Sequence, residues 1–260
     1  MKVDVVVDVG NTRIKWGRCS EEGVVEGASV SPDDEWDWIR QITIWQLEKP
    51  IRWAVAGVHP ARRDRLMKWI EKRGDQALLI YAHHQLPLTV QVQHPEKVGI
   101  DRLLNAVAAK IGALRFDSII IIDAGSAVTV DYLDETGAFR GGAIFPGFRL
   151  MGAALNEHTA LLPRTDLREP NPPLPGTNTE AAIKAGIYWA VAGGVKALIR
   201  QLTARSRTNR RPEIYLTGGD AGLLLPVMEP EVQYIPQLTL EGIRLTALSL
   251  PEPAAPHGPG

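Results

Sequence analysis

Apolar runs and turn residues alternate along the chain, and two stretches repeat almost the same pattern. Val3–Trp16 reads VDVVVDVGNTRIKW, and Ser118–Tyr132 reads SIIIIDAGSAVTVDY. In each stretch, a run of β-branched residues is typical of a buried strand, an Asp and a Gly follow at a turn, and the chain returns as a second, more polar strand. The pattern therefore predicts two hairpins of one design, one in each half of the chain.

The two hairpin turns carry residues that suit a phosphate site. Asp8 and Gly10 in the first turn match Asp123 and Gly125 in the second, and small polar residues lie beside both pairs. A glycine lets the backbone approach a ligand closely, and small side chains leave the N–H groups of the turn accessible to an anion. Two such turns facing one cleft would hold a polyphosphate, although each turn alone also suits an ordinary hairpin.

Apolar residues recur with helical spacing in much of the remaining chain, and shorter apolar runs lie between these segments. Helices are expected at Asp33–Glu48, Pro60–Lys72, Asp101–Leu114, Arg149–His158 and in a run that begins at the capping box Thr177–Glu180. Strands are expected at the short runs Ile51–Val58, Leu78–Tyr81 and Glu213–Thr217. This alternation of strands and helices is typical of an α/β protein.

The chain length suits two domains, because 260 residues contain ample material for two cores. The helix from Asp101 lies between the two repeats and is expected to connect the halves of the chain. A boundary near residue 116 divides the sequence into an N-terminal domain over 1–116 and a C-terminal domain over 117–250. Residues 251–260 read PEPAAPHGPG and cannot build a core, so a disordered tail is expected there.

Composition and charge favour a globular protein of the cytoplasm. Lys and Arg total 29 against 30 for Asp and Glu, so the chain lacks the positive excess of a nucleic-acid surface. The single cysteine, Cys19, cannot form a disulfide within the chain. No apolar run approaches the roughly 18 residues of a membrane span, and the N-terminus enters a strand without a leader. A cytoplasmic protein that binds neither nucleic acid nor membrane is expected.

Six motifs, taken in order, resemble those of type III pantothenate kinases, which belong to the actin-like superfamily of sugar and acetate kinases. The motifs are DVGNT at 8–12, GIDR at 99–102, IDAGSAVTVD at 122–131, GGAIFPG at 141–147, GTNTEAAIKAGI at 176–187 and LTGGDAG at 216–222. They extend over almost the whole chain, and their order makes the resemblance specific. It implies an α/β fold of two duplicated ribonuclease-H-like (actin-like ATPase) domains with a cleft between them.

The resemblance also implies a reaction and its partners. The reaction is ATP-dependent phosphorylation of pantothenate to 4'-phosphopantothenate, the first step of coenzyme A biosynthesis. The family uses Mg²⁺ and a monovalent cation (K⁺ or NH₄⁺) and forms homodimers. Two other functions remain open: an actin-like kinase with a different small hydroxyl acceptor, and a catalytically inactive nucleotide-binding regulatory protein. The presence of Asp101 argues against the inactive protein.

Individual roles follow from the same resemblance. Asp101 matches the catalytic base, and Asp123 matches the ligand of the monovalent cation. Contacts with ATP are expected at Asp8, Val9, Gly10, Asn11, Thr12, Arg13, Ile14, Lys15 and Ser126. Contacts with pantothenate are expected at Gly99, Ile100, Asp101, Arg102 and Thr179. Phosphoryl transfer depends chiefly on positioning and charge neutralisation, which carboxylates, an arginine and a glycine turn can supply.

Ordinary structural roles also fit several of these residues. Asp101 precedes an amphipathic run and suits a helix N-cap, Asp8 suits an Asx turn, and Thr179 suits the first turn of a helix. Other polar residues are interpreted as lying outside the site: a surface carboxylate at Asp131, and solvated cations at Arg62, Arg63 and Arg65.

Two positions depart from the family pattern. Val92 stands where the family usually has a tyrosine, and Ala56–Pro60 stands where small polar residues usually precede a proline. Ser126 keeps the hydroxyl group of the usual threonine. The departures concern the acceptor more than the nucleotide, so a weaker affinity for pantothenate or a different acceptor remains open.

Overall fold

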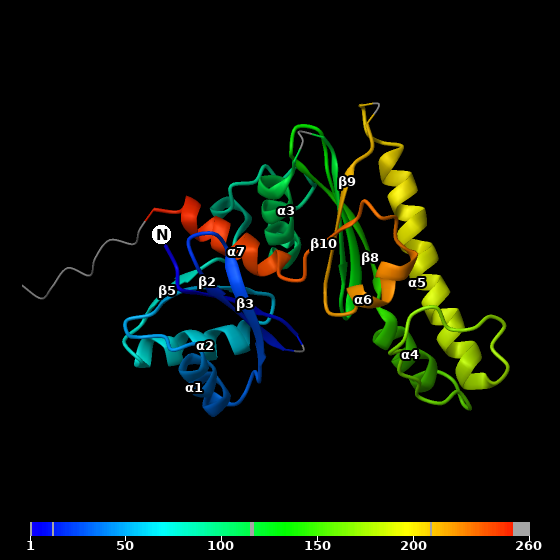
Figure 1. Ribbon diagram of the computed structural model, residues 1–260, viewed down its shortest axis with the longest axis horizontal. Helices are drawn as coiled ribbons and strands as arrows, with labels where there is room; N and C mark the ends of the chain where they lie inside the picture. The colour runs from blue at the N-terminus through cyan, green and yellow to red at the C-terminus, as the bar shows by residue number, and fades with distance from the viewer. Residues whose placement is uncertain (1, 12, 115–116, 209, 252–260) are drawn as a thin grey trace, which may run out of the picture. The chain divides into compact units, whose positions relative to one another are not determined.

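The computed structural model describes residues 2–11, 13–114, 117–208 and 210–251. These residues form two compact units. Unit 1 takes its described residues from 2–111 and 237–251, and unit 2 takes them from 112–236. Each unit contains one five-stranded sheet with helices packed against it (Figure 1).

The sheet of unit 1 has the strand order β3-β2-β1-β4-β5. Its first three strands pair antiparallel as a meander, and β4 and β5 pair parallel with β1 and with each other. The strands are β1 (Val5–Val9), β2 (Ile14–Cys19), β3 (Val24–Val30), β4 (Arg52–Gly57) and β5 (Gln76–Leu79).

The sheet of unit 2 repeats this plan with the order β10-β9-β6-β7-β8. The central strand again forms an antiparallel hairpin on one side and a parallel pair on the other. The strands are β6 (Ile119–Ala124), β7 (Ala127–Leu133), β8 (Phe139–Pro146), β9 (Glu213–Thr217) and β10 (Gln233–Tyr234). Both predicted hairpins are confirmed, and so is the duplicated α/β fold.

The core of unit 1 contains a cluster of buried tryptophans between the sheet and two helices. Trp16 of β2 and Trp53 of β4 have ring centroids 4.9 Å apart, and Trp38 and Trp69 have centroids 5.2 Å apart in the same edge-to-face geometry. These last two residues lie on α1 (Glu35–Ile44) and α2 (Pro60–Lys72), so the rings fix both helices on one face of the sheet.

A helix from the end of the chain packs against the sheet of unit 1. This helix, α7 (Leu238–Ser249), contacts β1, β2, β3 and β4. Its Leu240 approaches Gly17, whereas the neighbouring Trp16 belongs to the tryptophan core, so α7 covers the face opposite to α1 and α2 (Figure 1). The adjacent α3 (Ile100–Gly112) is joined to α7 by a hydrogen bond from the Thr239 hydroxyl group to Asn105 Oδ1, 2.7 Å long.

The position of α7 differs from the expected organisation, in which a C-terminal domain extended over 117–250. Unit 2 ends at 236, and the chain then returns to unit 1. The physical reason is the apolar face around Val6 and Gly17, against which Leu240 of α7 packs. The expected tail lies outside the described residues except for Pro251.

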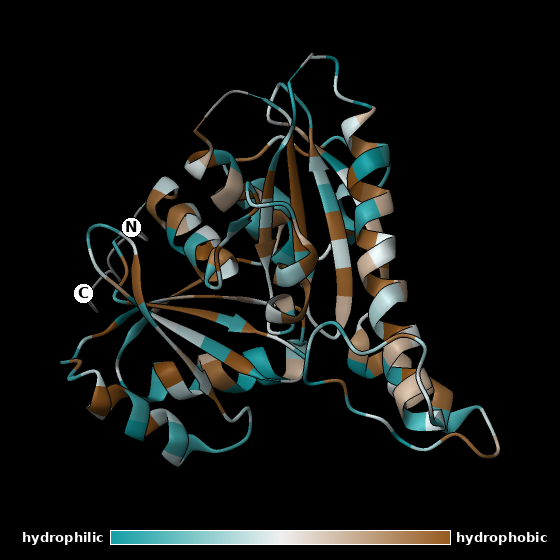
Figure 2. Cartoon of the chain, turned by 45° about the vertical axis from the view of Figure 1, so that its right-hand side comes forward, coloured by the Kyte–Doolittle hydropathy of each residue, from teal (hydrophilic) through white to brown (hydrophobic). Residues whose placement is uncertain are grey.

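Unit 2 is built around one long helix. This helix, α5 (Thr179–Thr203), packs with α4 (Phe148–Glu157) and α6 (Ala221–Leu224) around the core of the sheet. Figure 2 shows its turns alternating between hydrophilic and hydrophobic residues. Among the described helices, α5 alone is long and apolar enough to cross a membrane, with a mean hydropathy of 1.3 over an 18-residue window. The core helix of a soluble protein can have the same length and hydropathy, so α5 is weak evidence for a membrane span.

Helix boundaries differ from the expected ones at a few places. The N-cap of α5 is Asn178, whose side chain accepts a hydrogen bond from the Ala181 amide at 2.9 Å, and the expected capping box at Thr177 is therefore wrong by one residue. Pro60–Lys72 is confirmed at both ends. Three short 3₁₀ helices complete the described elements: η1 (His83–Gln85), η2 (Pro95–Lys97) and η3 (Leu225–Val227).

Candidate functional site

The first turn joins β1 to β2, and its described residues are Gly10, Asn11 and Arg13. The Gly10 amide donates a hydrogen bond to the Arg13 carbonyl group, 3.1 Å long. Just before the turn, Asp8 is 9% exposed and lies opposite Lys15 in the antiparallel pair. Val9 and Ile14 are buried beneath the turn, while Asn11 and Arg13 are exposed. The turn thus has an anchored base and a polar, accessible tip, and Thr12 lies outside the described residues.

The end of β4 supports the first turn from the side. The Val58 amide donates a hydrogen bond to the Val9 carbonyl group, 3.1 Å long. Gly57 has φ +146°, and a Cβ atom there would lie 2.4 Å from the Val9 carbonyl oxygen. Only glycine fits this backbone conformation and this approach. The departure from the family pattern at Ala56–Pro60 therefore includes a glycine on which the first turn depends.

The GIDR motif begins α3, and it fixes the Asp101 carboxylate through the main chain. Asp101 Oδ1 accepts a hydrogen bond from the Arg102 amide at 2.9 Å. A Cβ atom at Gly99 would lie 2.5 Å from the same oxygen, so glycine gives the carboxylate its space. The Gly99 carbonyl group accepts from the amides of Arg102 and Leu103. The helix therefore starts at Ile100, and the alternative role of Asp101 as the N-cap is wrong, because it lies inside the first turn.

The second turn joins β6 to β7 and is also closed by the amide of its glycine, but the closing hydrogen bond spans one residue fewer than in the first turn. The Gly125 amide donates to the Ala127 carbonyl group at 3.0 Å. Ser126 is exposed at the tip, and its carbonyl group accepts a hydrogen bond from the Gly147 amide at 2.9 Å. Gly147 approaches so closely that a Cβ atom there would lie 2.2 Å from the Gly125 carbonyl oxygen. The second turn is thus held by the start of α4.

Asp123 lies between two threonines on neighbouring strands. It is directly opposite Thr129 on β7 and in parallel register with Thr217 on β9. Paired residues in a sheet project to the same face. The Thr129 hydroxyl oxygen is buried and has no hydrogen-bond partner among the described residues. A carboxylate beside an unpaired hydroxyl oxygen fits a cation that prefers oxygen ligands.

A second carboxylate of unit 2, Asp220, lies beside this turn. Its amide donates to the Ala124 carbonyl group at 2.8 Å, and its Oδ1 is 3.4 Å from Arg149 Nη2. Its Oδ2 is buried without a described partner. Burial raises the pKa of Asp220 above its ordinary value, and the attraction of Arg149 only partly opposes this. The sequence pattern did not single out Asp220, because its partner Arg149 lies 71 residues away.

Thr179 lies at the start of α5 and lines an apolar cavity of about 1040 Å³ in unit 2. The walls of the cavity come mainly from α4 and α5, including Leu150, Met151, Ile183 and Ile187. Among the described residues that line it there is no Asp, Glu, Lys or Arg. The hydroxyl group of Thr179 is thus one of few polar groups at an apolar surface.

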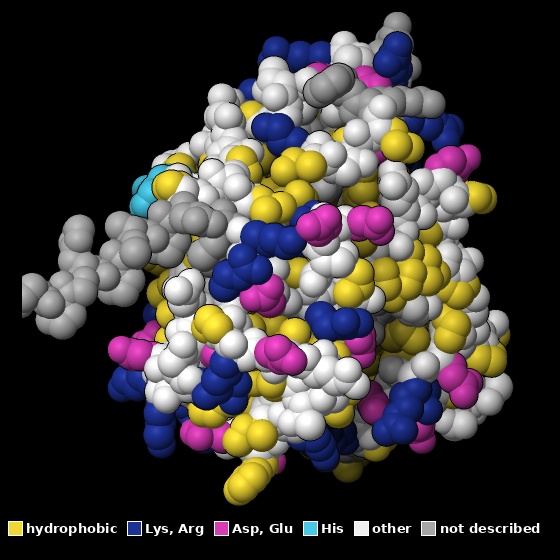
Figure 3. Space-filling view, turned by 60° about the vertical axis from the view of Figure 1, so that its left-hand side comes forward, with side chains coloured by type: hydrophobic (Ala, Val, Ile, Leu, Met, Phe, Trp, Pro, Cys, Tyr) yellow, Lys and Arg dark blue, Asp and Glu magenta, His cyan; other side chains and the backbone are white. Residues whose placement is uncertain are grey.

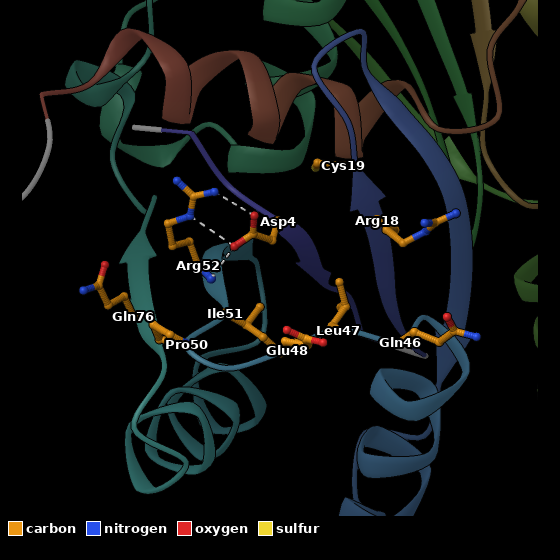
Figure 4. Close-up of a pocket in the computed structure, with 10 residues that line it drawn as sticks. All are labelled: Asp4, Arg18, Cys19, Gln46, Leu47, Glu48, Pro50, Ile51, Arg52 and Gln76. Atoms are coloured by element: carbon orange, nitrogen blue, oxygen red, sulfur yellow. Dashed lines mark hydrogen bonds and ion pairs between the residues drawn. The ribbon is translucent and has the colours of Figure 1, made fainter.

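A second cavity, of about 660 Å³, opens at the other end of the sheet of unit 1 (Figure 4). Asp4 accepts hydrogen bonds there from the Arg52 amide, Nε and Nη2, at 2.9, 3.1 and 2.8 Å. Burial alone would raise the pKa of Asp4, but the bonds and charge of Arg52 outweigh it and lower that pKa. Cys19 also lines this cavity, and burial raises its pKa to about 12. Since the six residue steps along β1 from Asp4 to Gly10 span roughly 20 Å, this cavity does not belong to the first turn.

Two interpretations made from the sequence need correction. Asp131 is 1% exposed, and is therefore a buried carboxylate and not a surface one. Arg62 is half-buried and donates hydrogen bonds to the first turn, whereas Arg63 and Arg65 form ion pairs with Asp64 and Asp33. On the face drawn in Figure 3, basic and acidic side chains lie interspersed among the described residues, in keeping with the net charge of −1.

The predicted residues are divided between the units. Unit 1 contains the first turn and the GIDR motif, and unit 2 contains Asp123, Ser126 and Thr179. The family model described as type III pantothenate kinase matches residues 5–201, which include all of them. The chain belongs to the type III pantothenate kinase family. It is therefore a kinase, and its family membership indicates phosphorylation of pantothenate in coenzyme A biosynthesis.

Individual relatives agree over nearly the full length. The chain is 32% identical over 251 residues to the type III pantothenate kinase of Alkalilimnicola ehrlichii, covering 92% of this chain and 95% of the relative. It is 34% identical over 251 residues to the type III pantothenate kinase of Moorella thermoacetica, and the match covers 93% of this chain and 97% of the relative. Similarity over almost the whole of both chains agrees with the order of the six motifs.

A solved structure supports the fold at lower sequence similarity. The activator of the 2-hydroxyisocaproyl-CoA dehydratase from Clostridium difficile with bound ADPNP superposes with a TM-score of 0.55 at 15% identity. The match covers 95% of this chain and 94% of that protein. At this level of identity the match concerns the fold alone, and it confirms the predicted actin-like ATPase architecture.

Proposed function

We propose that this protein transfers the γ-phosphoryl group of ATP to the hydroxyl group of pantothenate, with Asp101 as the general base. The observation that carries this proposal is the fixed position of the Asp101 carboxylate. Its Oδ1 is held by the Arg102 amide, in space that Gly99 leaves open. A carboxylate fixed in this way is ready to accept the hydroxyl proton as the oxygen attacks the γ-phosphorus. A placed general base typically contributes about 10²- to 10⁴-fold in rate.

The nucleotide binds at the two turns in this proposal. The first turn, with residues 8–15, offers amides, Asn11 and Lys15 to the phosphate groups, and Ser126 of the second turn contacts ATP as well. Anions are stabilised where backbone N–H groups and cations converge. Asp8 supplies a carboxylate oxygen of the kind that Mg²⁺ prefers. When bound, Mg²⁺ neutralises charge on the phosphate groups.

The monovalent cation is assigned to unit 2. Asp123 is the proposed ligand, and the unpaired hydroxyl oxygen of Thr129 supports the assignment because it provides a second oxygen on the same face of the sheet. Potassium prefers several oxygen ligands, and ammonium can donate hydrogen bonds to the same atoms. This cation would add positive charge near the second turn.

Pantothenate is held by the GIDR motif and by Thr179 in this proposal. The planar guanidinium group of Arg102 can bind the pantothenate carboxylate through two parallel hydrogen bonds. Thr179 adds a hydroxyl group at the edge of an apolar cavity, which suits a substrate with both polar and apolar parts. We further propose that the protein acts as a homodimer in the cytoplasm.

The experiment that tests the proposal is phosphoryl transfer by the purified protein. ATP, Mg²⁺ and pantothenate are supplied with either K⁺ or Na⁺, and 4'-phosphopantothenate is measured by mass spectrometry. We expect product that depends on pantothenate and forms faster with K⁺. ATP binding without any phosphopantothenate would contradict the proposed acceptor. Because Val92 replaces the usual tyrosine, other small hydroxyl compounds are the next acceptors to test.

A further inference from the structure

The guanidinium group of Arg62 reaches the first turn from α2. Its Nη1 donates a hydrogen bond to the Gly10 carbonyl oxygen at 3.5 Å, and a second to the Asn11 carbonyl oxygen. Arg62 lies in the first turn of α2, where its amide donates to Nδ1 of the N-cap His59 at 3.4 Å. The backbone amide of Arg62 is therefore held at the start of α2, and its guanidinium group is held at the first turn.

The base of this contact is rigid, because β4 and β1 are directly paired. Val9 and Gly57 are register partners, and the Val58 amide bonds the Val9 carbonyl group. The chain between Gly57 and Arg62 contains Pro60 at the start of α2, which fixes the backbone further. Arg62 therefore approaches the first turn from a fixed origin within the same unit.

Arg62 differs from the neighbouring arginines in its ion pairing. Among the described residues Arg62 forms no ion pair, whereas its neighbour Arg63 lies 2.9 Å from Asp64 and Arg65 lies 3.3 Å from Asp33. The first turn of α2 contains no acidic residue. A cation at the positive end of a helix dipole is unfavourably placed unless an anion binds nearby. The arrangement favours an anion at the first turn.

The hydrogen bonds of Arg62 also orient the peptide groups of the turn. In a planar trans peptide the C=O and the following N–H point in opposite directions. Because the Gly10 carbonyl group points toward Arg62, the Asn11 amide N–H points away from it. Holding the carbonyl groups on one side thus presents an amide on the other side, where an anion can accept its hydrogen bond.

We propose that Arg62 is a positioning residue for the phosphate groups of ATP. It holds the carbonyl groups of Gly10 and Asn11 so that the amide side of the first turn is set before the nucleotide arrives, and its positive charge attracts the polyphosphate. This inference rests on the proposed function, in which the first turn binds those phosphate groups. Preset donors cost less to order on binding than mobile ones.

The test compares nucleotides with different numbers of phosphate groups. Dissociation constants for AMP, ADP and ATP are measured by calorimetry on the wild-type protein, Arg62→Ala, Arg62→Lys and the matched control Arg63→Ala. We expect Arg62→Ala to weaken ATP binding about tenfold or more and AMP binding less than about twofold. Arg62→Lys should recover part of the loss, since one ammonium group can still hold one carbonyl oxygen. Arg63→Ala should bind all three nucleotides as the wild type does.

Steady-state kinetics gives a second readout. In Arg62→Lys, which keeps the charge, the KM for ATP should rise while the KM for pantothenate stays close to the wild-type value. An unchanged ATP dissociation constant in Arg62→Ala would overturn the inference. Equal losses for AMP and ATP would overturn it too, because they would indicate general distortion of the site. Failure of the wild-type protein to bind ATP would instead contradict the proposed function.

Discussion

Asp8 and Asp123 occupy the same position in the two sheets, since each is the penultimate residue of the central strand. Two residues after each aspartate lies a glycine whose amide closes the turn. The Gly10 amide donates to a carbonyl oxygen at 3.1 Å, and the Gly125 amide donates to one at 3.0 Å. Their cross-strand neighbours differ. Asp8 lies opposite Lys15, whereas Asp123 lies opposite Thr129. The hairpin of unit 1 thus has a lysine beside its aspartate, which suits binding of a phosphate group. The hairpin of unit 2 has a threonine hydroxyl group beside its aspartate, which suits binding of a cation.

Removing the proposed base should stop turnover and leave nucleotide binding intact. In Asp101→Asn, the amide has nearly the same shape but cannot accept the hydroxyl proton, so kcat should fall by about 10²- to 10⁴-fold. The ATP dissociation constant should change less than about twofold. Turnover is measured as phosphopantothenate formed, and binding by calorimetry. The control is Glu96→Gln, an exposed carboxylate near the motif that pairs with His94. Near wild-type turnover in Asp101→Asn would remove Asp101 from the mechanism.

Loss of the Asp123 carboxylate should increase the requirement for potassium. In Asp123→Ala the remaining hydroxyl oxygens bind a monovalent cation more weakly, so the K⁺ concentration at half-maximal activity should rise about tenfold or more. Thr129→Val should shift the same titration in the same direction by a smaller factor, because it removes one neutral oxygen. An unaltered K⁺ titration in Asp123→Ala would count against the cation site.

A methyl group at Gly57 should destabilise unit 1 and disturb the first turn. Gly57→Ala places a Cβ atom 2.4 Å from the Val9 carbonyl oxygen at φ +146°. Strained backbone of this kind costs about 1–3 kcal/mol, and the clash adds to it. Gly74→Ala is the matched control, since Gly74 has φ +78° but nothing within 4 Å of the added atom. Thermal unfolding should show the larger loss for Gly57→Ala, and equal losses would contradict the contact with Val9.

Replacing Asp220 should stabilise the protein in a manner that depends on pH. Burial raises the pKa of Asp220 above the ordinary 3.8, so the folded state holds this proton more tightly than the unfolded state. Its contribution to stability is therefore greatest at low pH and decreases as the pH rises from 3.8 through the raised value.

Asp220→Asn removes this dependence because an amide carries no charge. The melting temperature of the variant should exceed that of the wild type near neutral pH, and the difference should vanish as the pH approaches 4 or below. Thermal unfolding across this pH range measures it, with the exposed Glu157→Gln as control. If the difference in melting temperature between Asp220→Asn and the wild type does not change with pH, the raised pKa of Asp220 is not the cause of the stabilisation.

Local patterns predicted the elements that carry the proposed site. Both hairpins have β-branched runs that end at an Asp and a Gly, and α2 has a proline at its start and a tryptophan on its buried face. These signals lie within about 15 residues of sequence, so no tertiary information is needed to read them. They were sufficient to place Gly10 and Gly125 at the turns of two hairpins.

Features that depend on tertiary contact could not be read in this way. Arg62, Arg63 and Arg65 lie close together in the sequence and look alike there. Only the fold shows that Arg62 contacts Gly10, whereas the other two pair with carboxylates. Likewise, α7 has no motif that assigns it to unit 1. Its position follows from the apolar face around Gly17 that Leu240 covers. Asp131 has the appearance of a surface carboxylate in sequence but is buried in the fold.

The return of α7 to unit 1 determines the order in which the two cores can close during synthesis. Unit 2 has its complete sequence once residue 236 has left the ribosome, because it is formed by the single segment 112–236 of the chain. The sheet of unit 1 is made first but keeps one apolar face uncovered until Leu238–Ser249 has followed. The second half of the chain can therefore mature before the first. The unit that carries Asp8 and Asp101 is completed only after Leu238–Ser249 has been made.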